Sequence, residues 1–131
     1  GELFFVPAFF ISRQPEYRAA IRFYVDTGSS KTIVNDLDAY RMNLSYEGLD
    51  TPPANLQGVG GFVDSFLLKA CSLVFITSSG NELIERLPEV YVLRHENFNP
   101  NDRDQLPSLL GLDVLRKYRI NFKSKKVILK R

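Results

Sequence analysis

One acidic residue at the end of an apolar strand constrains this sequence more than any other feature. Within the apolar run 19–25, Ile21, Phe23 and Val25 alternate with Arg22 and Tyr24, which is the period-two pattern of a half-buried strand. The strand leads directly into Asp26, Thr27, Gly28 and Ser29. A carboxylate at the end of a buried strand loses hydration. A purely structural role in the core would therefore require a specific hydrogen-bond or ion-pair partner. The alternative is a turn that ends the strand, because Asp, Gly and Ser are all common turn residues.

Short apolar runs separated by turn residues continue along the chain and predict a mainly β fold. A helix is expected over residues 36–43, with Asn35 as its N-cap, and another from about Leu112 to Tyr118. No repeat or linker divides the sequence, so residues 1–131 are interpreted as a single domain. Strands are expected at residues 3–11, 19–25, 67–77, 89–93, 109–111, 120–122 and 127–129.

Glycines gather in residues 56–66, where Gly58, Gly60 and Gly61 give the composition of a hairpin tip. A polar stretch, residues 97–105, is expected to form a loop.

Three segments, in this order along the chain, resemble the retropepsin-like aspartic peptidases. Residues 23–30 (FYVDTGSS) resemble the active-site strand and loop, and residues 58–62 (GVGGF) resemble the glycine-rich flap tip. Residues 109–115 (LLGLDVL) resemble the apolar-apolar-Gly segment and the helix after it. With the terminal hairpins, the resemblance covers nearly the whole chain. It implies a closed, mostly antiparallel β-barrel of the retropepsin (acid protease) type, with one or two short helices and half an active site per chain.

The resemblance also implies a mechanism. Two carboxylates about 3 Å apart cannot both ionise, so they share one proton and activate a water molecule between them. The chain has a single Asp-Thr-Gly, at Asp26, and Asp113 stands at an expected helix start. A working site therefore requires Asp26 from two chains, which predicts a twofold homodimer acting on polypeptides. The remaining aspartates are expected in polar or turn surroundings: Asp36, Asp38, Asp50, Asp64, Asp102 and Asp104.

The family pattern assigns roles to residues at matched positions. Asp26, Thr27 and Gly28 would be catalytic, with Thr27 bonding across the twofold axis. Ser29 could donate a hydrogen bond to the outer oxygen of Asp26. Asp113 would anchor the active-site loop through Thr32, although an acid in a first helical turn is equally natural.

Substrate contacts are expected from the flap and from the end of the loop. Val59, between Gly58 and Gly60, would lie over the substrate, and Leu109 would line a pocket beside Gly111. For Val59 and Leu109, packing in the hydrophobic core is the competing interpretation.

Two departures from the viral pattern affect specificity. The stretch between the flap and Gly111 is longer, and Ser30 and Lys31 replace acidic residues that often follow the triplet. Lys31 suggests tolerance for acidic substrate side chains.

Composition excludes several other classes. One cysteine, Cys71, and one histidine, His95, cannot build a structural zinc site in one chain, and no nucleotide-binding motif is present, so no cofactor is expected. No stretch approaches the ~20 apolar residues of a membrane helix. Cys71 is expected to be a small buried hydrophobe and His95 a surface or hydrogen-bonded residue. The lone cysteine gives no sign of an oxidising compartment, so an intracellular (cytoplasmic) protein, or a domain of a longer one, is expected.

Basic residues concentrate at the end of the chain, where residues 116–131 hold eight of the 17. They are interpreted as a solvated end strand that discourages edge pairing, and no nucleic-acid partner is expected at a net charge of +2. Two alternatives to the peptidase stay open: a peptide-binding or assembly module with little turnover, and an accessory domain that clamps nucleic acid through this basic end.

Overall fold

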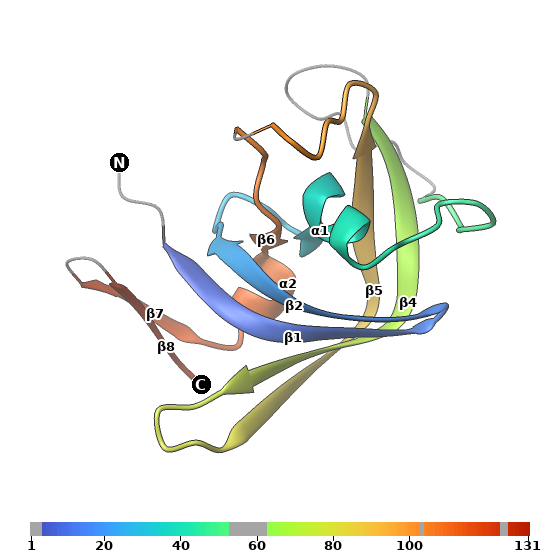
Figure 1. Ribbon diagram of the computed structural model, residues 1–131. Coiled ribbons are helices and arrows are strands. Elements are labelled where there is room, and N and C mark those ends of the chain that lie inside the picture. Colours follow the sequence, from blue (N-terminus) through green and yellow to red (C-terminus); the bar gives the residue numbers. More distant parts are fainter. Residues whose placement is uncertain (1–3, 53–62, 103, 124–125) are drawn as a thin grey trace.

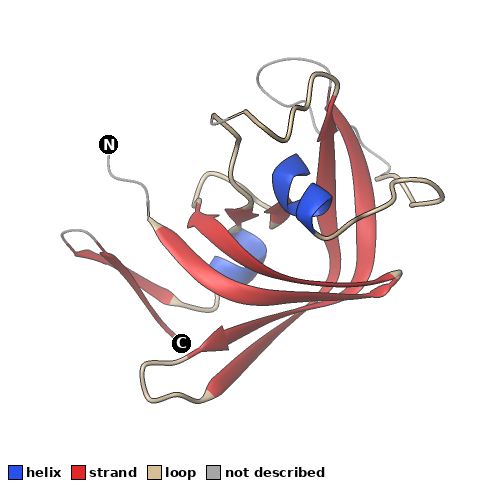
Figure 2. Cartoon of the chain, viewed as in Figure 1, coloured by secondary structure: helices blue, strands red, loops and turns tan. Residues whose placement is uncertain are grey.

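The computed structural model of the protein describes residues 4–52, 63–102, 104–123 and 126–131 (Figure 1). These residues form a mainly β structure with two short helices (Figure 2). The strands are β1 (Phe5–Gln14), β2 (Glu16–Val25), β3 (Ile33–Val34), β4 (Val63–Ile76), β5 (Glu82–His95), β6 (Leu109–Leu110), β7 (Arg119–Lys123) and β8 (Lys126–Lys130). The helices are α1 (Asp36–Arg41) and α2 (Leu112–Leu115).

Six strands close into a barrel in the order β1-β2-β6-β3-β5-β4. The long hairpins β1–β2 and β4–β5 are antiparallel and form most of its wall. The two-residue strand β6 lies between β2 and β3, parallel to the former and antiparallel to the latter. The predicted closed, mostly antiparallel barrel with short helices is therefore confirmed. The insertion of β6 places residues 109–110, which are distant in sequence, against the end of β2.

The barrel interior is filled by the inward residues of the alternating strands. Phe10, Phe23, Leu68 and Leu73 are fully buried there, and each such side chain stabilises the fold by about 1.5–3 kcal/mol relative to exposure. Cys71 lies in the same core, as predicted, and burial raises the pKa of its thiol to about 11. The thiol is therefore protonated and unreactive at neutral pH.

Both helices were predicted, with differences at their ends. Asn35 occupies the N-cap position of α1, but its side chain makes no capping bond and donates from Nδ2 to Pro107 O at 2.7 Å. Helix α2 ends at Leu115 rather than near Tyr118, because the chain continues there in tighter turns, such as Tyr118 N to Leu115 O at 3.0 Å. No helix in the described part of the chain is long and apolar enough to cross a membrane.

The terminal hairpin β7–β8 forms a two-stranded sheet of its own, as predicted. A buried carboxylate, Glu85 on β5, holds the chain on both sides of this hairpin. It accepts hydrogen bonds from Lys117 Nζ at 3.2 Å, Tyr118 OH at 2.7 Å and Arg131 Nη1 at 2.8 Å. Burial, and then the Glu85 hydrogen bond, raise the pKa of the Tyr118 hydroxyl. Charge-assisted bonds of this kind stabilise more than neutral ones, so the cluster fixes the hairpin against the barrel.

Candidate active site

Asp26 follows the last residue of β2 and is held by main-chain contacts. Its N–H donates to Leu110 O at 3.1 Å, which extends the pairing of β2 with β6 by one residue. Its carboxylate Oδ1 accepts from Gly28 N at 2.9 Å, and its carbonyl accepts from Ser29 N at 3.2 Å. The chain thus turns tightly around a half-buried carboxylate. The turn expected as the alternative is present, and it holds one carboxylate oxygen in a fixed position.

The loop after Asp26 packs directly on the segment that joins β6 to α2. An added Cβ on Gly111 would lie 2.4 Å from both the carbonyl carbon and oxygen of Lys31, and 2.9 Å from Thr32 N. Only glycine permits this approach of two backbones. Leu112 N also donates to Ser29 O at 2.8 Å, so the loop is attached to the start of α2 as well.

A buried network of three residues fixes this contact. Thr32, which is fully buried, donates from Oγ1 to Asp113 Oδ1 at 2.7 Å, and its N–H donates to Asp113 Oδ2 at 3.0 Å. The same hydroxyl accepts from Gly111 N at 3.1 Å. The pairing that the sequence predicted between Thr32 and Asp113 is therefore present. Both carboxylate oxygens are used, so the end of the loop has one defined position.

The other predicted site residues differ in their surroundings. The Ser29 hydroxyl donates to Lys31 O at 2.7 Å instead of to Asp26, because the turn brings that carbonyl within reach. Thr27, Ser30 and Lys31 are exposed.

Beside the loop, Leu109 is half-buried and pairs with Tyr24 and Ile33. Gly58, Val59 and Gly60 of the predicted flap lie outside the described residues. Residues 63–66, also assigned to the flap, are the first residues of β4.

Ser108 was not predicted from the sequence as part of this region. Its carbonyl accepts from Tyr24 N at 2.8 Å. Its buried hydroxyl accepts from Asn35 N at 3.0 Å and donates to Asp38 Oδ2 at 2.6 Å. Burial raises the pKa of Asp38, against smaller lowering effects of the Ser108 hydrogen bond and the Arg41 charge. Ser108 thus joins α1, β2 and β6 directly before Leu109.

Asp36 was expected in polar or turn surroundings, and this was wrong. It is 5% exposed and accepts from the backbone N–H of His95 at 2.6 Å, while its other oxygen lies 2.6 Å from His95 Nδ1. His95 is accordingly a hydrogen-bonded histidine, one of the alternatives predicted for it. The pair joins α1 to the end of β5.

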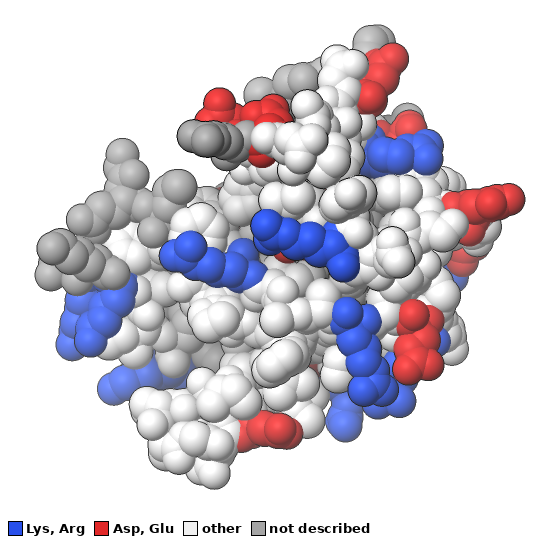
Figure 3. Space-filling view, in the orientation of Figure 1, with Lys and Arg blue, Asp and Glu red and all other residues white. Residues whose placement is uncertain are grey.

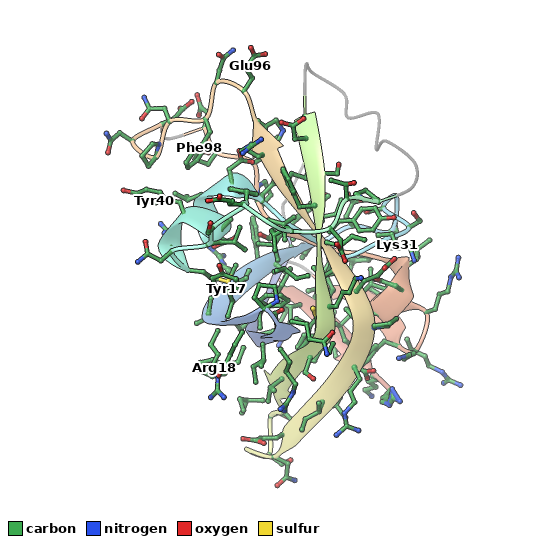
Figure 4. The ribbon with its side chains drawn as sticks, turned by 90° about the vertical axis from the view of Figure 1, so that its right-hand side faces the viewer. Tyr17, Arg18, Lys31, Tyr40, Glu96 and Phe98 are labelled. Atoms are coloured by element: carbon green, nitrogen blue, oxygen red, sulfur yellow. The ribbon has the colours of Figure 1, made fainter. Side chains whose placement is uncertain are left out.

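Among the described residues, Asp26 is the acidic side chain that this loop fixes in position next to solvent-exposed residues. The described residues contain no group of three metal-ligating side chains. A lone carboxylate fixed on one oxygen can accept or donate a proton, and a second one is needed to polarise a carbonyl at the same time. Figure 4 shows Lys31, from the same loop, on one side of the molecule and Arg18 on the other.

Comparisons with known proteins show which proteins have a similar architecture. No family model matches the sequence, and no curated protein matches it significantly. The structure is similar to a retropepsin-like aspartic protease from Rickettsia conorii, with a TM-score of 0.54 and 19% identity over 97% of this chain and 81% of that one. It is also similar to the retroviral protease-like domain of Ddi1 from Leishmania major, with a TM-score of 0.52 and 14% identity over 98% and 90% of the two chains. The chain therefore has the retropepsin-like fold.

Proposed function

We propose that the protein is an aspartic endopeptidase whose active site forms between two copies of the chain. The observation that carries the proposal is the placement of Asp26. It ends β2 in a turn that fixes one carboxylate oxygen by the Gly28 N–H at 2.9 Å. The turn itself is held by Gly111 and by the pairing of Thr32 with Asp113. A rigid support for one acid, in a fold that known aspartic proteases share, suits catalysis better than a plain turn.

The mechanism requires two such acids. The Asp26 carboxylates of two chains would share one proton, because like charges about 3 Å apart cannot both ionise. The ionised member would accept a proton from water while the protonated member hydrogen-bonds the scissile carbonyl. Water would add to the carbonyl carbon, and proton transfer to the amide nitrogen would release the amine, with no covalent intermediate on the protein.

The proposed substrate is an extended polypeptide segment. A cleft between strands recruits main-chain hydrogen bonds from an extended chain. Leu109 is half-buried beside the loop and would contact an apolar side chain, whereas the exposed Lys31 would favour an acidic side chain nearby. Equal cleavage of matched acidic and basic peptides would remove the role of Lys31.

A subunit-mixing experiment tests the shared site. Wild type and Asp26→Asn are refolded separately and together, and cleavage of a peptide library is followed from about pH 4 to 7. The variant alone should be inactive, and refolding equal amounts together should leave about one quarter of the dimers as wild type. The matched control Asp102→Asn changes an exposed carboxylate and should leave activity unchanged.

Other outcomes separate the alternatives. Equal cleavage by wild type and Asp26→Asn would show that Asp26 is not the catalyst. Activity that falls only in proportion to dilution of the wild type would place the whole site in one chain. If neither protein cleaves any peptide, yet both form dimers that bind peptides, the chain is a binding module.

A further inference from the structure

The outer surface of the barrel carries an uninterrupted apolar row across four strands. Phe9 on β1 pairs with Ala20 on β2 and with Val74 on β4, and Val74 pairs with Ile84 on β5. Paired residues point to the same face of a sheet. Phe9 is 55% exposed and Ile84 47%, so this face is turned to solvent. We call Ala20, Phe9, Val74 and Ile84 the outer row.

The surface beside the outer row is hollowed. The ladder between β1 and β4 ends at Phe9 and Val74, although both strands continue. The space between their ends forms a groove of about 360 Å³, lined by Pro7 and Arg22 on one side and Ile76 on the other. Three of the six exposed large hydrophobic residues in the described part of the chain, Phe9, Ile76 and Ile84, lie at this hollow or in the outer row. Such a concentration is typical of interaction sites.

Arginines flank the outer row on both sides. Ile11 pairs with Arg18 and with Ser72, which pairs with Arg86, so one neighbouring row is basic at both ends. On the other side, Arg22 pairs with Pro7 at the groove.

Few carboxylates in the described part of the chain pair with these arginines. Among the described residues, Arg22 and Arg86 form no ion pair, and Arg18 reaches only the exposed Glu16 at 3.5 Å. Glu82 is the one carboxylate that lines the hollow surface. In Figure 3, where β1 lies in front, Lys and Arg side chains cross an uncharged surface, and Asp and Glu lie mostly toward its margins.

We propose that the outer row binds an amphipathic helix whose apolar stripe is flanked by acidic side chains. Four strands at about 4.8 Å spacing give a row about 14 Å long, which matches two to three turns of helix. The flanking rows lie about 7 Å to each side, where the carboxylates of such a helix reach. Arginine forms paired hydrogen bonds with carboxylates, so Arg18, Arg22 and Arg86 select an acidic partner.

The shape of the surface favours a polypeptide over a lipid membrane. Membrane contact is made by protruding apolar side chains, whereas this surface is hollowed beside the outer row. The outer row lies on the side of the molecule that carries Arg18, away from Lys31 of the active-site loop (Figure 4). The interaction is therefore independent of the proposed catalysis.

Two labelled peptides test the proposal by fluorescence anisotropy. One is a helix with a leucine stripe flanked by glutamates, and the other carries lysines in place of the glutamates. The glutamate peptide should bind wild type at least about tenfold more tightly than the lysine peptide does. Phe9→Ser, and the pair Arg18→Glu with Arg86→Glu, should each weaken binding at least about tenfold. The matched pair Arg116→Glu with Lys126→Glu makes the same charge change elsewhere and should bind as wild type does.

Unfolding midpoints of all variants, and the peptide-induced shifts of backbone amides, accompany the binding data. Binding with shifts confined to β1, β2, β4 and β5 supports the proposal. Failure of the glutamate peptide to bind, equal binding of the two peptides, or indifference to the variants overturns it. Binding to phosphatidylcholine–phosphatidylserine vesicles in place of the peptide, or self-association that Phe9→Ser abolishes, assigns the surface to lipid or to a second copy and also overturns it.

Discussion

Replacing Gly111 with alanine should separate the Asp26 loop from its support. Gly111 has extended backbone angles, with φ of −99°, which alanine adopts without strain. The added methyl group would instead lie 2.4 Å from the carbonyl carbon and oxygen of Lys31. Both partners are backbone atoms and cannot rotate away, so the whole loop must move.

The magnitude follows from three contributions. Overpacking of this kind costs about 1–3 kcal/mol, and the displaced bond from Gly111 N to Thr32 Oγ1 costs about 1 kcal/mol. Alanine restricts the unfolded chain, which offsets about 0.4–1 kcal/mol. The free energy of unfolding should therefore fall by about 1–3.6 kcal/mol, which lowers the midpoint of thermal unfolding by roughly 5–15 °C.

Circular dichroism in urea measures this loss, since the chain contains no tryptophan. Gly80→Ala is the matched control: φ is +87° there, and an added Cβ meets nothing within 4 Å. That variant should lose about 1–2 kcal/mol through backbone strain alone and keep the proposed peptidase activity, whereas Gly111→Ala should lose it. A Gly111→Ala protein as stable and as active as Gly80→Ala would refute the close contact.

Two further substitutions test the polar contacts around the loop. Thr32→Val leaves Asp113 and Gly111 N without the hydroxyl and should lower the urea-unfolding free energy by about 2–4 kcal/mol; Thr32→Ser should recover most of it, and equal losses would contradict the assignment. Burial raises the pKa of Asp38, so its contribution to stability is full below the unfolded pKa and is lost as pH rises through the folded pKa. The unfolding free energy of wild type should therefore rise relative to Asp38→Asn as pH falls from about 7 to 3, and a constant difference would contradict this.

Much of the fold could be predicted because its strands are apolar runs separated by turn residues. The second half of strand β2 also alternates between apolar and other side chains, and the β1–β2 hairpin and the terminal hairpin lie close to their expected positions. Strand β5 begins seven residues before the expected Glu89, at Glu82, and continues through Pro88. It does so because the ladder is interrupted opposite Pro88, where Ala70 has φ of +51° and neither residue is paired. A sequence shows the proline but not the irregular residue that accommodates it.

The candidate site could be predicted only in part. The Asp26 triplet and the pairing of Thr32 with Asp113 came from residues that resemble a family pattern. Ser108 and Asn35 have no such pattern, and 73 positions separate them in sequence. Asp36 was expected in polar or turn surroundings, so its burial against His95 became visible only once α1 and β5 were in place.

The hydrogen bonds of the buried Glu85 help to hold the C-terminal hairpin, β7–β8, to the barrel. No ladder in the described part of the chain joins β7–β8 to the barrel, so side chains hold this hairpin: those around Glu85, and Ile120, Val127 and Leu129, which pack against the core. The Asp26 loop is positioned by different residues, at the opposite end of α2 from Tyr118. Substitutions around Glu85 should therefore loosen the C-terminal hairpin, while the Asp26 loop keeps its geometry.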